Sequence, residues 1–497
     1  MRIDKLETDT IKKALLVSVV SILAFPTAAY AMQPEEQSEV HVAVNGSDES
    51  GDGTQSSPYG TVAMAARKEP GSVIIVHGGE YGPIELGPDC SGSKNSPTVI
   101  RPEEGETVIV HAEDGIGISL FNVDNITIDG LETVVVHAED GIGISLLNVD
   151  NITLDGLETD GGTHGIEYMS TNEAGDQPLE NIMIRNCTVH GVRGVHGICV
   201  YACNDLAPVS QITIEGCEVF DCECGSSETM VLNGNIDGFL IAENTIHDSN
   251  NIGIDMIGFE GTAKHSEDDS TQNPYEVDQA RNGICRDNVI YNISTEGNAA
   301  YYEDGEYDPS ADGIYVDGGR DIEIYNNFIF NCDIGLEVAT EHSPDDNELF
   351  RVSGIRVHDN VIADCNGWTG ICFGGYDKDL GFTEECEFDH NTLVDNDCQI
   401  GVQRSRNNKV HANLILGGET GVEFNDYCDE EDMINDIYGN AVADLADEES
   451  WSAEYGKVYS ERTETADGFR SLIEDVGSRF VPGKNIMEIY ERQRLAH

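Results

Sequence analysis

The 497-residue sequence predicts an all-β fold, a single-stranded parallel β-helix, or solenoid, of about eleven or more coils. Three observations predict it. The first is a recurring stretch that alternates apolar and polar residues and then turns, as at residues 126–128, 182–184 and 322–324. Alternation with a period of two residues is typical of β-strands and not of helices.

The second observation is a fixed position after these strands that is usually Asn. The gaps between its copies range from 22 to 44 residues, which is the size of one coil of a solenoid. Asn side chains at the same turn of successive coils can form a hydrogen-bonded ladder. The position is held by Leu131, Leu157, Cys187, Cys217, Asn244, Asn288, Asn327, Asn360, Asn391, Asn413 and Asn440.

The third observation is a second strand at a constant offset, which begins with Gly and an apolar residue, as at Gly253, Gly313 and Gly335. With at least two strands per coil the chain has to wind, and each strand stacks on its counterpart about 4.8 Å away. Residues 107–132 and 133–158 are nearly identical. We interpret them as one duplicated coil, which a solenoid tolerates because each coil contacts mainly its neighbours.

Four segments follow from these patterns. Residues 1–31 combine a charged start, an apolar run and an A-x-A pattern, which predicts a cleaved signal peptide, with an uncleaved anchor as the alternative. Residues 32–106 are expected to start and cap the β-helix, and residues 107–440 to form its coils. Residues 441–497 lose the strand pattern and end in a run that favours helix, so we expect a C-terminal cap over the open end.

The chain has 93 acidic and 27 basic residues and a net charge of −66, and the acids are spread along every coil. A hydrated acidic shell of this kind suits high salt, which screens its self-repulsion. Nucleic acid and anionic membranes are excluded as partners by repulsion. We expect a secreted or cell-surface monomer whose partner is a polysaccharide. A uronate-containing polysaccharide would need salt or a bridging cation.

Fourteen cysteines in a secreted chain permit disulfides, although the spacing does not give the connectivity. The pairs Cys187 with Cys217 and Cys332 with Cys365 should be stacked neighbours, either bridged or as buried thiols. A zinc site at a cysteine cluster near His190 and His196 is a further alternative, although its spacing matches no strong zinc pattern. That cluster consists of Cys199, Cys203, Cys222 and Cys224.

Three carboxylates are expected on one face of the sheet. In the Gly-initiated strands the first and third residues after Gly are apolar and point inward, so the second and fourth point outward. Successive coils then bring Asp255, Asp317 and Glu337 within about 10 Å of each other. We predict them as catalytic residues, while solvated surface charge is the alternative in so acidic a chain. His342 could serve as a further acid or base, or be a structural turn residue.

The two longest ladder gaps, 44 and 39 residues, flank these same coils. Insertions at residues 259–283 and 294–311 would rise as walls and form a cleft. Tyr301, Tyr302 and Tyr307 in the second wall are suited to stacking on sugar rings. Predicted substrate-binding residues are Asn233, Asn235, Tyr301, Tyr302 and Tyr315, although Asn233 and Asn235 could instead cap turns.

The opening of the chain resembles secreted right-handed β-helix proteins of the pectate-lyase-like superfamily. The similar elements are Val42-Ala-Val-Asn-Gly-Ser-Asp, Gly71-Ser-Val-Ile-Ile-Val and Gly78-Gly-Glu-Tyr. Within that superfamily, Ala311-Asp312-Gly313 and Asp333-Ile-Gly-Leu-Glu337 are similar to Ca²⁺-binding elements of family 9 pectate lyases. The resemblance implies that the β-helix is right-handed. It also implies a Ca²⁺ ion held by Asp312, Asp333 and Glu337. Ile334 stands where that family has a second Asp, and no outward Lys in the following coils matches its base.

Three functions remain open at this point. A Ca²⁺-dependent polysaccharide lyase is placed slightly ahead, because the acidic cluster offers a cation site. A glycoside hydrolase is the alternative, because Asp317 with Asp255 or Glu337 suits the wider carboxylate separation of inverting enzymes. A noncatalytic glycan-binding or structural solenoid is the third, because fold does not imply function.

Overall fold

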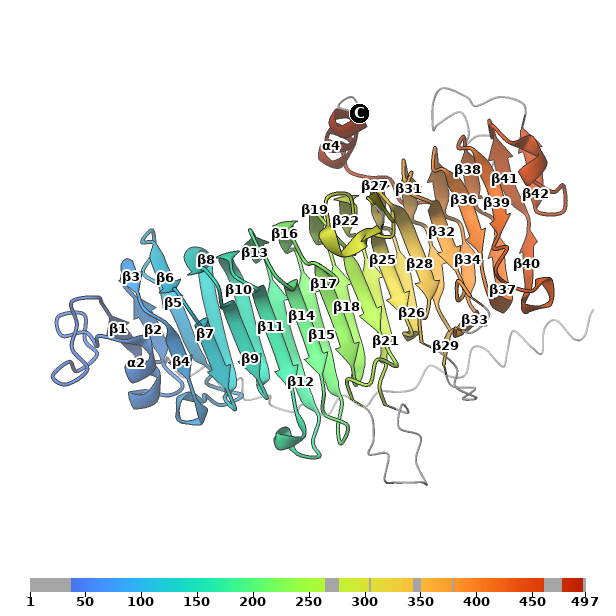
Figure 1. Cartoon of the computed structure of the whole chain (residues 1–497). Coiled ribbons are helices and arrows are strands. Elements are labelled where there is room, and N and C mark those ends of the chain that lie inside the picture. The colour runs from blue at the N-terminus through green and yellow to red at the C-terminus, as the bar shows by residue number, and fades with distance from the viewer. Residues whose placement is uncertain are drawn as a thin grey trace, which may run out of the picture. The chain divides into compact units, whose positions relative to one another are not determined.

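The computed structural model describes residues 37–263, 277–303, 305–342, 350–377, 380–459 and 476–494. Residues 37–497 form one compact unit, a right-handed parallel β-helix (Figure 1). A typical coil contributes three strands, such as β12 (Leu179–Arg185), β13 (Thr188–His190) and β14 (His196–Ala202). The fold predicted from the repeat is confirmed. The predicted signal peptide lies outside the described residues.

The third strand of each coil stacks into a sheet of twelve described strands, here called sheet 1. Most of its middle strands are the Gly-initiated strands of the sequence, and Thr229 and Gln399 stand at the Gly position in two of them. Sheet 1 consists of β4 (Ile84–Leu86), β7 (Ile116–Phe121), β9 (Ile142–Leu147), β11 (His164–Ser170), β14, β17 (Met230–Gly234), β20 (Ile254–Ile257), β25 (Asp312–Asp317), β28 (Ile334–Ala339), β32 (Thr369–Phe373), β36 (Cys398–Val402) and β39 (Thr420–Phe424).

The other two sides of each coil merge through their corners into sheet 2. One side contains β1 (Glu39–Val42), β2 (Val73–Val76), β5 (Thr98–Pro102), β12, β15 (Val209–Glu215), β18 (Ile236–Ala242), β21 (Ala280–Arg286), β26 (Arg320–Tyr325), β29 (Arg351–Ser353), β30 (Arg356–His358), β33 (Phe382–Glu384), β34 (Glu387–Asp389), β37 (Ser405–His411) and β40 (Met433–Tyr438). The other side contains β3 (Gly79–Tyr81), β6 (Val108–Ala112), β13, β16 (Glu218–Cys222), β19 (Thr245–Ser249), β22 (Val289–Ile293), β27 (Phe328–Cys332), β31 (Val361–Ala363), β35 (Thr392–Val394), β38 (Leu414–Leu416), β41 (Asn440–Ala443) and β42 (Gly456–Tyr459). Two longer strands, β8 (Asp124–Ala138) and β10 (Asp150–Gly161), run along both sides.

The asparagine ladder forms at the corner between the two sides of sheet 2. The Oδ1 atom of Asn288 accepts from the backbone N–H and the side-chain amide of Asn244, at 3.0 and 3.1 Å. The Asn288 amide then donates to Oδ1 of Asn327 at 2.9 Å. This pattern continues coil by coil to Asn440. The predicted ladder is therefore confirmed, and it satisfies backbone donors that a buried corner would otherwise leave unpaired.

The duplicated coil stacks directly on its copy. Val108 in β6 pairs with Val134 in β8, and Ile116 in β7 pairs with Ile142 in β9. Both pairs are 26 residues apart, the length of the sequence repeat. The copied strands therefore keep one register, and the shift in the pairing of β8 with β10 lies between Asp129 and Val134, at the junction of the two copies.

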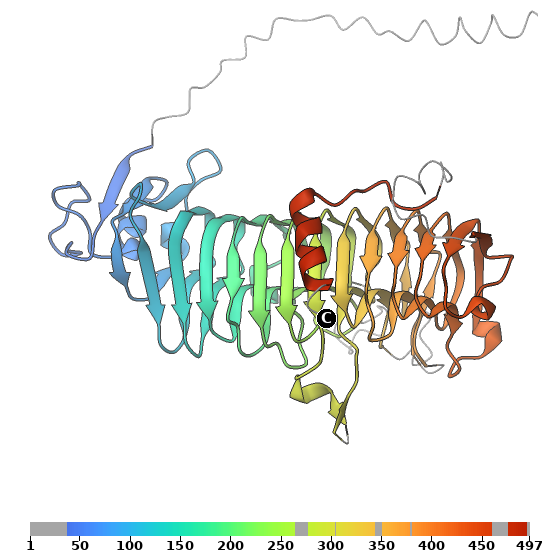
Figure 2. The same cartoon turned by 90° about the horizontal axis from the view of Figure 1, so that it is seen from above.

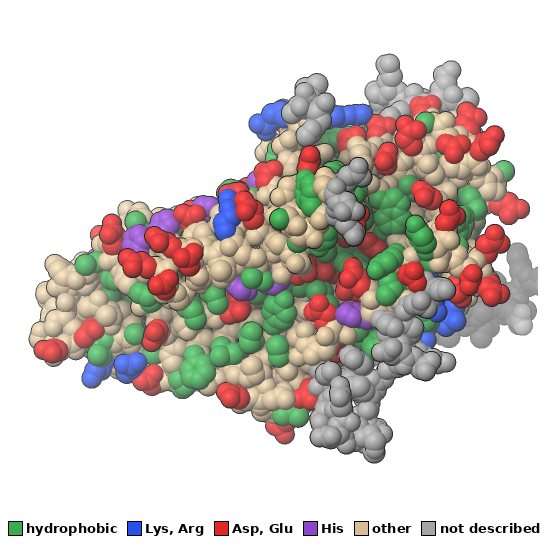
Figure 3. Space-filling model, viewed as in Figure 1, with side chains coloured by type: hydrophobic (Ala, Val, Ile, Leu, Met, Phe, Trp, Pro, Cys, Tyr) green, Lys and Arg blue, Asp and Glu red, His purple; other side chains and the backbone are tan. Residues whose placement is uncertain are grey.

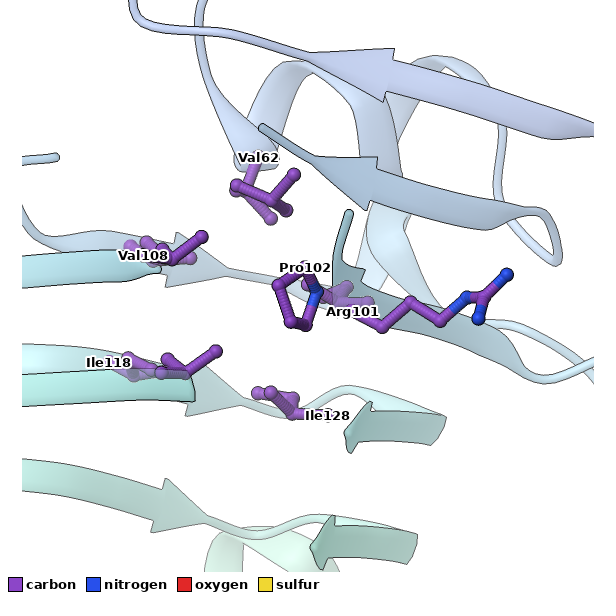
Figure 4. Close-up of a pocket in the computed structure, with 10 residues that line it drawn as sticks. Val62, Arg101, Pro102, Val108, Ile118 and Ile128 are labelled. Atoms are coloured by element: carbon purple, nitrogen blue, oxygen red, sulfur yellow. The ribbon is translucent and has the colours of Figure 1, made fainter. Parts of the chain in front are cut away.

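One continuous apolar core fills the solenoid, and α2 (Val62–Lys68) covers its N-terminal end. Val62, Ala65 and Ala66 of this helix are buried, and the Thr61 hydroxyl caps its first turn by accepting from the Met64 N–H. A small gap between α2 and the first coils is lined almost entirely by apolar side chains (Figure 4). This gap is part of the interior packing and lies far along the chain from the predicted site.

The C-terminal segment covers the core in two different ways. Leu445 and Trp451 pack against the last part of the core, as expected of a cap. The predicted helix is present as α4 (Lys484–Arg494), but it lies against the side of the middle coils (Figure 2). Tyr490 contacts Phe328 and Phe330 edge-on there. The expectation that this helix closes the open end was wrong, because its apolar residues match an outward aromatic patch on sheet 2 instead.

All fourteen cysteines are free thiols in the structure. Cys187 and Cys217 lie at matching positions of neighbouring coils, next to the pair Thr188 and Glu218, and Cys332 and Cys365 follow the pair Phe330 and Ala363 in the same way. The predicted stacking is confirmed, in its thiol form. Among the described residues, no helix has the length and apolar character needed to cross a membrane.

Candidate functional site

Three polar side chains stand in one row on the outer face of sheet 1. Asp255 in β20 pairs with Tyr315 in β25, and Tyr315 pairs with Glu337 in β28. The preceding residues of these strands, such as Ile254 and Ile314, belong to the core. Since neighbouring strands lie about 4.8 Å apart, the backbones of Asp255 and Glu337 are about 10 Å apart. The structure therefore brings these residues together as the alternation predicted.

Asp317 lies two residues after Tyr315 on the same face of β25. It is one coil away from Asp255 on one side and from Glu337 on the other. A diagonal neighbour of this kind lies about 7–8 Å away. The three carboxylates therefore form a shallow triangle around Tyr315.

These carboxyl groups are shielded from water. Asp255 is 2% and Asp317 7% exposed, and Glu337 is half-buried. Burial, reinforced by the charge of Glu341, raises the pKa of Glu337 to about 8. Burial and repulsion from Glu228 and other acids raise the pKa of Asp255 well above its usual range. At neutral pH, Glu337 therefore holds a proton that it can donate.

Four more acids extend this group into what we call the carboxylate cluster. Asp312 is 2% exposed, and burial raises its pKa well above the usual range, as it raises the pKa of Glu228 to about 7. Repulsion among the acids adds to these shifts. The carboxylate cluster consists of Glu228, Asp255, Glu260, Asp312, Asp317, Glu337 and Glu341.

The cluster has little positive charge to balance it. In the described part of the chain, the ion pairs of the cluster involve histidines rather than Lys or Arg. His196 Nδ1 lies 3.6 Å from Glu228, and His342 Nε2 lies 3.7 Å from Asp317. Burial lowers the pKa of His196 to about 4 and also lowers the pKa of His342, so both are neutral at pH 7. The acids therefore cannot all be ionised together unless a cation joins them.

Several polar atoms at the cluster are buried without a hydrogen-bond partner. Such orphaned atoms are rare in folded proteins and call for a ligand or a functional reason. Five of them lie on residues of this region: Oδ1 of Asn233, Asn251, Asp255 and Asp312, and Nε2 of His342. Five of the ten such atoms of the described residues therefore lie at the cluster.

The predicted second wall, residues 294–311, projects from sheet 1 beside the cluster (yellow in Figure 2). It contains a short 3₁₀ turn at Ala299–Tyr301, β23 (Tyr302–Glu303) and β24 (Glu306–Tyr307). The Tyr301 hydroxyl accepts from the Asn251 amide at 3.0 Å, which holds the wall against the coil that carries Asp255. Figure 3 shows acidic and hydrophobic side chains side by side on the middle coils of this face.

Asp333 fixes the base of this wall. Its Oδ2 atom accepts from the Thr295 N–H at 2.8 Å, from the Thr295 hydroxyl at 3.0 Å and from the Ala311 N–H at 3.3 Å. Thr295 and Ala311 are the two ends of the insertion. One carboxylate oxygen therefore holds both ends together.

The first predicted wall, residues 259–283, is described only at its ends. Asp278 accepts from the backbone N–H groups of Gly261 and Ala263 at 2.6 and 2.8 Å. These bonds join the two ends of the insertion, whose residues 264–276 lie outside the described part.

The aromatic residues fall into two groups. Tyr302 is 44% and Tyr307 37% exposed, and their rings lie 6.1 Å apart on the wall. Tyr315 is only 5% exposed, packed with Ile252 and Ala339. The wall tyrosines are accessible to a sugar ring, whereas Tyr315 separates Asp255 from Glu337.

The two predicted asparagines also differ, because the side chain of one faces the carboxylate cluster and that of the other does not. Asn233 donates to Glu260 and faces the carboxylate cluster. Asn235 donates to Asn204 O at 2.9 Å and accepts from Arg281 at 3.0 Å, so its side chain is engaged within the protein. Of the two, Asn233 is the one with an orphaned oxygen.

The residues expected to hold Ca²⁺ are not gathered at one point. Among the described residues, Asp312, Asp333 and Glu337 are not a set whose ligand atoms all lie within 4.8 Å of one another. Asp333 faces the base of the wall, as its three donors show. Sequence reasoning assigned no role to Glu228, Glu260 or Glu341, which lie outside the central strands, so the strand alternation gives no signal for them.

Fold and geometry together define a right-handed parallel β-helix protein with a buried cluster of carboxylates on sheet 1. A family model described as periplasmic copper-binding protein (NosD) matches residues 102–258 and 266–454. The chain belongs to this family. A curated relative from Bacillus subtilis (strain 168), the uncharacterized protein YwoF, is 32% identical over 462 residues, which cover 88% of this chain and 87% of the relative.

Two solved structures show the same fold at low sequence identity. The GH136 lacto-N-biosidase from Eubacterium ramulus is 14% identical, with a TM-score of 0.51 over 82% of this chain and 68% of that chain. The PL6 family alginate lyase AlyGC is 12% identical, with a TM-score of 0.51 over 90% of this chain and 58% of that chain. These likenesses support the fold, and the function has to be argued from the site.

Proposed function

We propose that the protein is a secreted carbohydrate-active enzyme that cleaves a polysaccharide at the carboxylate cluster, by hydrolysis. The observation that carries this proposal is the register of β20, β25 and β28, which places Asp317 diagonally to Asp255 and to Glu337. The resulting backbone separation of about 7–8 Å is compatible with the distance of about 6.5–9.5 Å between the carboxyl groups of inverting glycosidases. Water fits between two carboxyl groups at this distance.

The roles follow from the environment of each group. Glu337 is protonated at neutral pH because its pKa is about 8, so it is suited to protonate the leaving oxygen. Asp317 lies beside His342 and accepts the Glu341 N–H at 3.2 Å. Burial and the charge of Glu341 raise the pKa of Asp317 as well, while the hydrogen bonds from the Glu341 N–H and from Thr340 lower it. Because these two donors stabilise its ionised form, we assign Asp317 as the base that activates water, with Asp255 as the alternative. Tyr302 and Tyr307 on the wall would stack on neighbouring sugar rings.

A Ca²⁺-dependent lyase is the second candidate, and the uncompensated charge of the cluster favours it. A lyase uses a cation to acidify the proton next to a uronate carboxylate and a base to remove it. Asp312 and Glu337 offer hard oxygen ligands suited to Ca²⁺. Of the basic residues near these coils, Arg404 and Arg406 are engaged with Leu380 O and Glu384, and Lys264 and Lys378 lie outside the described residues. Because no base is identified among the described residues, we place hydrolysis first.

The family description names copper, but the cluster does not suit that metal. Carboxylates are ligands for Ca²⁺, Mg²⁺ and Mn²⁺, whereas copper prefers thiolate, thioether and imidazole. The proposal therefore rests on sugar chemistry at the cluster and not on copper.

The test measures the release of reducing ends and the absorbance of unsaturated products in the same reaction. The secreted chain is incubated with neutral glycans, polygalacturonate and alginate in high salt, with Ca²⁺ or with chelator. We expect reducing ends without absorbance, inversion at the anomeric carbon, and a loss of about 10²-fold or more in Glu337→Gln and Asp317→Asn. Glu423→Gln is the matched control, since Glu423 is an exposed residue in the same row of sheet 1, at β39.

Other outcomes decide against hydrolysis. Absorbance that vanishes with chelator would make the protein a lyase and move the role of Glu337 to cation binding. If neither reducing ends nor unsaturated-product absorbance increases with any glycan, the result would contradict the enzyme proposal and favour a binding role.

A further inference from the structure

A second group of ligating side chains lies on sheet 1, outside the carboxylate cluster. His164 and Glu167 belong to β11 and Cys199 to the neighbouring β14, where Glu167 and Cys199 are direct partners. One ligand atom from each of the three lies within 4.8 Å of the other two. An ion between them would touch an imidazole, a carboxylate and a thiol at once.

The hydrogen bonds around His164 fix its free nitrogen. Thr163 Oγ1 lies 3.0 Å from Gly141 O and 3.1 Å from His164 Nδ1. A carbonyl oxygen cannot donate, so the Thr163 hydroxyl donates to it and accepts from the Nδ1–H of His164. The lone pair of the imidazole is then on Nε2. Metal-binding histidines are oriented in this way, with the second nitrogen donating to the protein.

The other two groups are also prepared for a cation. Glu167 Oε2 accepts from the Ser145 hydroxyl at 3.0 Å, which orients the carboxylate and leaves its second oxygen to coordinate. Cys199 is completely buried. Its thiol lies beside Glu167, the direct partner of Cys199 on β11, and within 4.8 Å of ligand atoms of both His164 and Glu167.

We propose that His164, Glu167 and Cys199 bind one Zn²⁺ ion, with a fourth position open. Three protein ligands from Cys, His and Glu with an open site match zinc in its catalytic form. Ca²⁺ and Mg²⁺ are excluded because they take oxygen ligands, and the carboxylate favours Zn²⁺ over Cu⁺, which prefers sulfur and imidazole. Since His164 and Glu167 are half-buried, the open position faces the outside of sheet 1.

This site shares no residue with the carboxylate cluster and lies in line with its Asp255. Cys199 pairs with Val231, and Val231 pairs with Asp255, so the backbones of Cys199 and Asp255 are about 10 Å apart along one row. The cysteine set considered from the sequence is different: Cys203, Cys222 and Cys224 are not gathered with Cys199 among the described residues. Only the strand register revealed that His164 and Glu167 meet Cys199.

The test uses the full chain after chelation and dialysis. We expect one equivalent of Zn²⁺ in addition to any ion at a second group, His41, His77 and Glu103. Substituting Co²⁺ should give a thiolate-to-cobalt charge-transfer band, which only a cysteine-containing site produces. His77→Gln is the control, because it removes a ligand of the thiol-free group and should leave the band unchanged.

Cys199→Ser should abolish the band, and His164→Gln should weaken Zn²⁺ binding at least tenfold. His164→Gln keeps the test decisive if the buried Cys199→Ser variant fails to fold, as circular dichroism will show. Any one of three results would overturn the assignment. The first is a missing band, and the second is a band that survives in His164→Gln at wild-type affinity. The third is retention of Cu⁺ without binding of Zn²⁺ or Co²⁺.

Discussion

At the scale of residues, the corners of the solenoid depend on a left-handed residue followed by a ladder residue. Asn326 has a φ of 56° and precedes Asn327, and Asp359 has a φ of 54° and precedes Asn360. Even Ala412, before Asn413, has a φ of 54°, although Ala has no side-chain bond that favours this conformation. The ladder bonds of the following Asn therefore outweigh the local strain.

The ladder predicts a large local cost for removing one Asn. Asn360 donates to Ile324 O and Asn391 Oδ1, both at 3.0 Å, and accepts from Asn327. Asn360→Ala leaves these buried groups unpaired and should lower the free energy of unfolding by about 2–4 kcal/mol. Urea denaturation of the variant and the unchanged protein measures this difference in the free energy of unfolding. Asn331→Ala is the control, since the Asn331 amide donates to Asn292 in a bond that is only partly buried. An equal loss in both variants would refute the buried-ladder explanation.

The carboxylate cluster predicts a pH dependence of stability. A carboxyl whose pKa is raised on folding binds its proton more tightly in the folded state, so stability is lost as pH rises. For Glu337 the loss spans pH of about 4.5 to 8, and for Glu228 about 4.5 to 7. Thermal unfolding between pH 4.5 and 8 should show a falling Tm. Glu337→Gln should flatten this slope and exposed Glu430→Gln should not, and identical slopes would contradict the raised pKa.

At the scale of elements, two segments that do not belong to the coils are attached to them by few groups. Residues 294–311 are held at both ends by Asp333 and in the middle by Tyr301. Helix α4 is held by Tyr490 on aromatic side chains and by the ion pair of Arg494 with Asp395. The Asn298 amide adds hydrogen bonds to Gly225 O and Asn250 O for the first segment, and Ile486 and Met487 add apolar contacts for α4.

Asp333→Ala should loosen the wall without unfolding the solenoid. The Thr295 and Ala311 N–H groups lose their acceptor, a local cost of about 2–4 kcal/mol. Hydrogen exchange of these two amides should accelerate, and limited proteolysis should cut within 294–311. Asp308→Ala, which changes an exposed carboxylate in the same segment, should leave both measurements unchanged. Unchanged exchange in Asp333→Ala would mean that other contacts hold the wall.

At the scale of the whole molecule, the charge of −66 makes the folded state repel itself. Salt screens this repulsion, because the Debye length falls from about 10 Å at 0.1 M to about 3 Å at 1 M. We therefore expect the Tm to rise steadily with NaCl at neutral pH.

The same titration at about pH 4 is the control for this prediction, because many carboxylates are protonated there. The dependence on salt should become much smaller. A Tm at neutral pH that does not respond to NaCl would contradict the high-salt interpretation of the composition.

The sequence by itself determined the coils, the ladder, the duplicated coil and the row of Asp255 and Glu337. These features depend on a local alternation of residues that repeats along the chain. Because the repeats stack, residues at equivalent positions of successive repeats lie next to each other in the structure. Only the tertiary structure decided what lies between and beside the coils. Asp333 holds the wall, α4 lies on the side of the middle coils, and His164 meets Cys199. The sequence could not predict these contacts, because they join residues whose separation along the chain does not follow from the repeat.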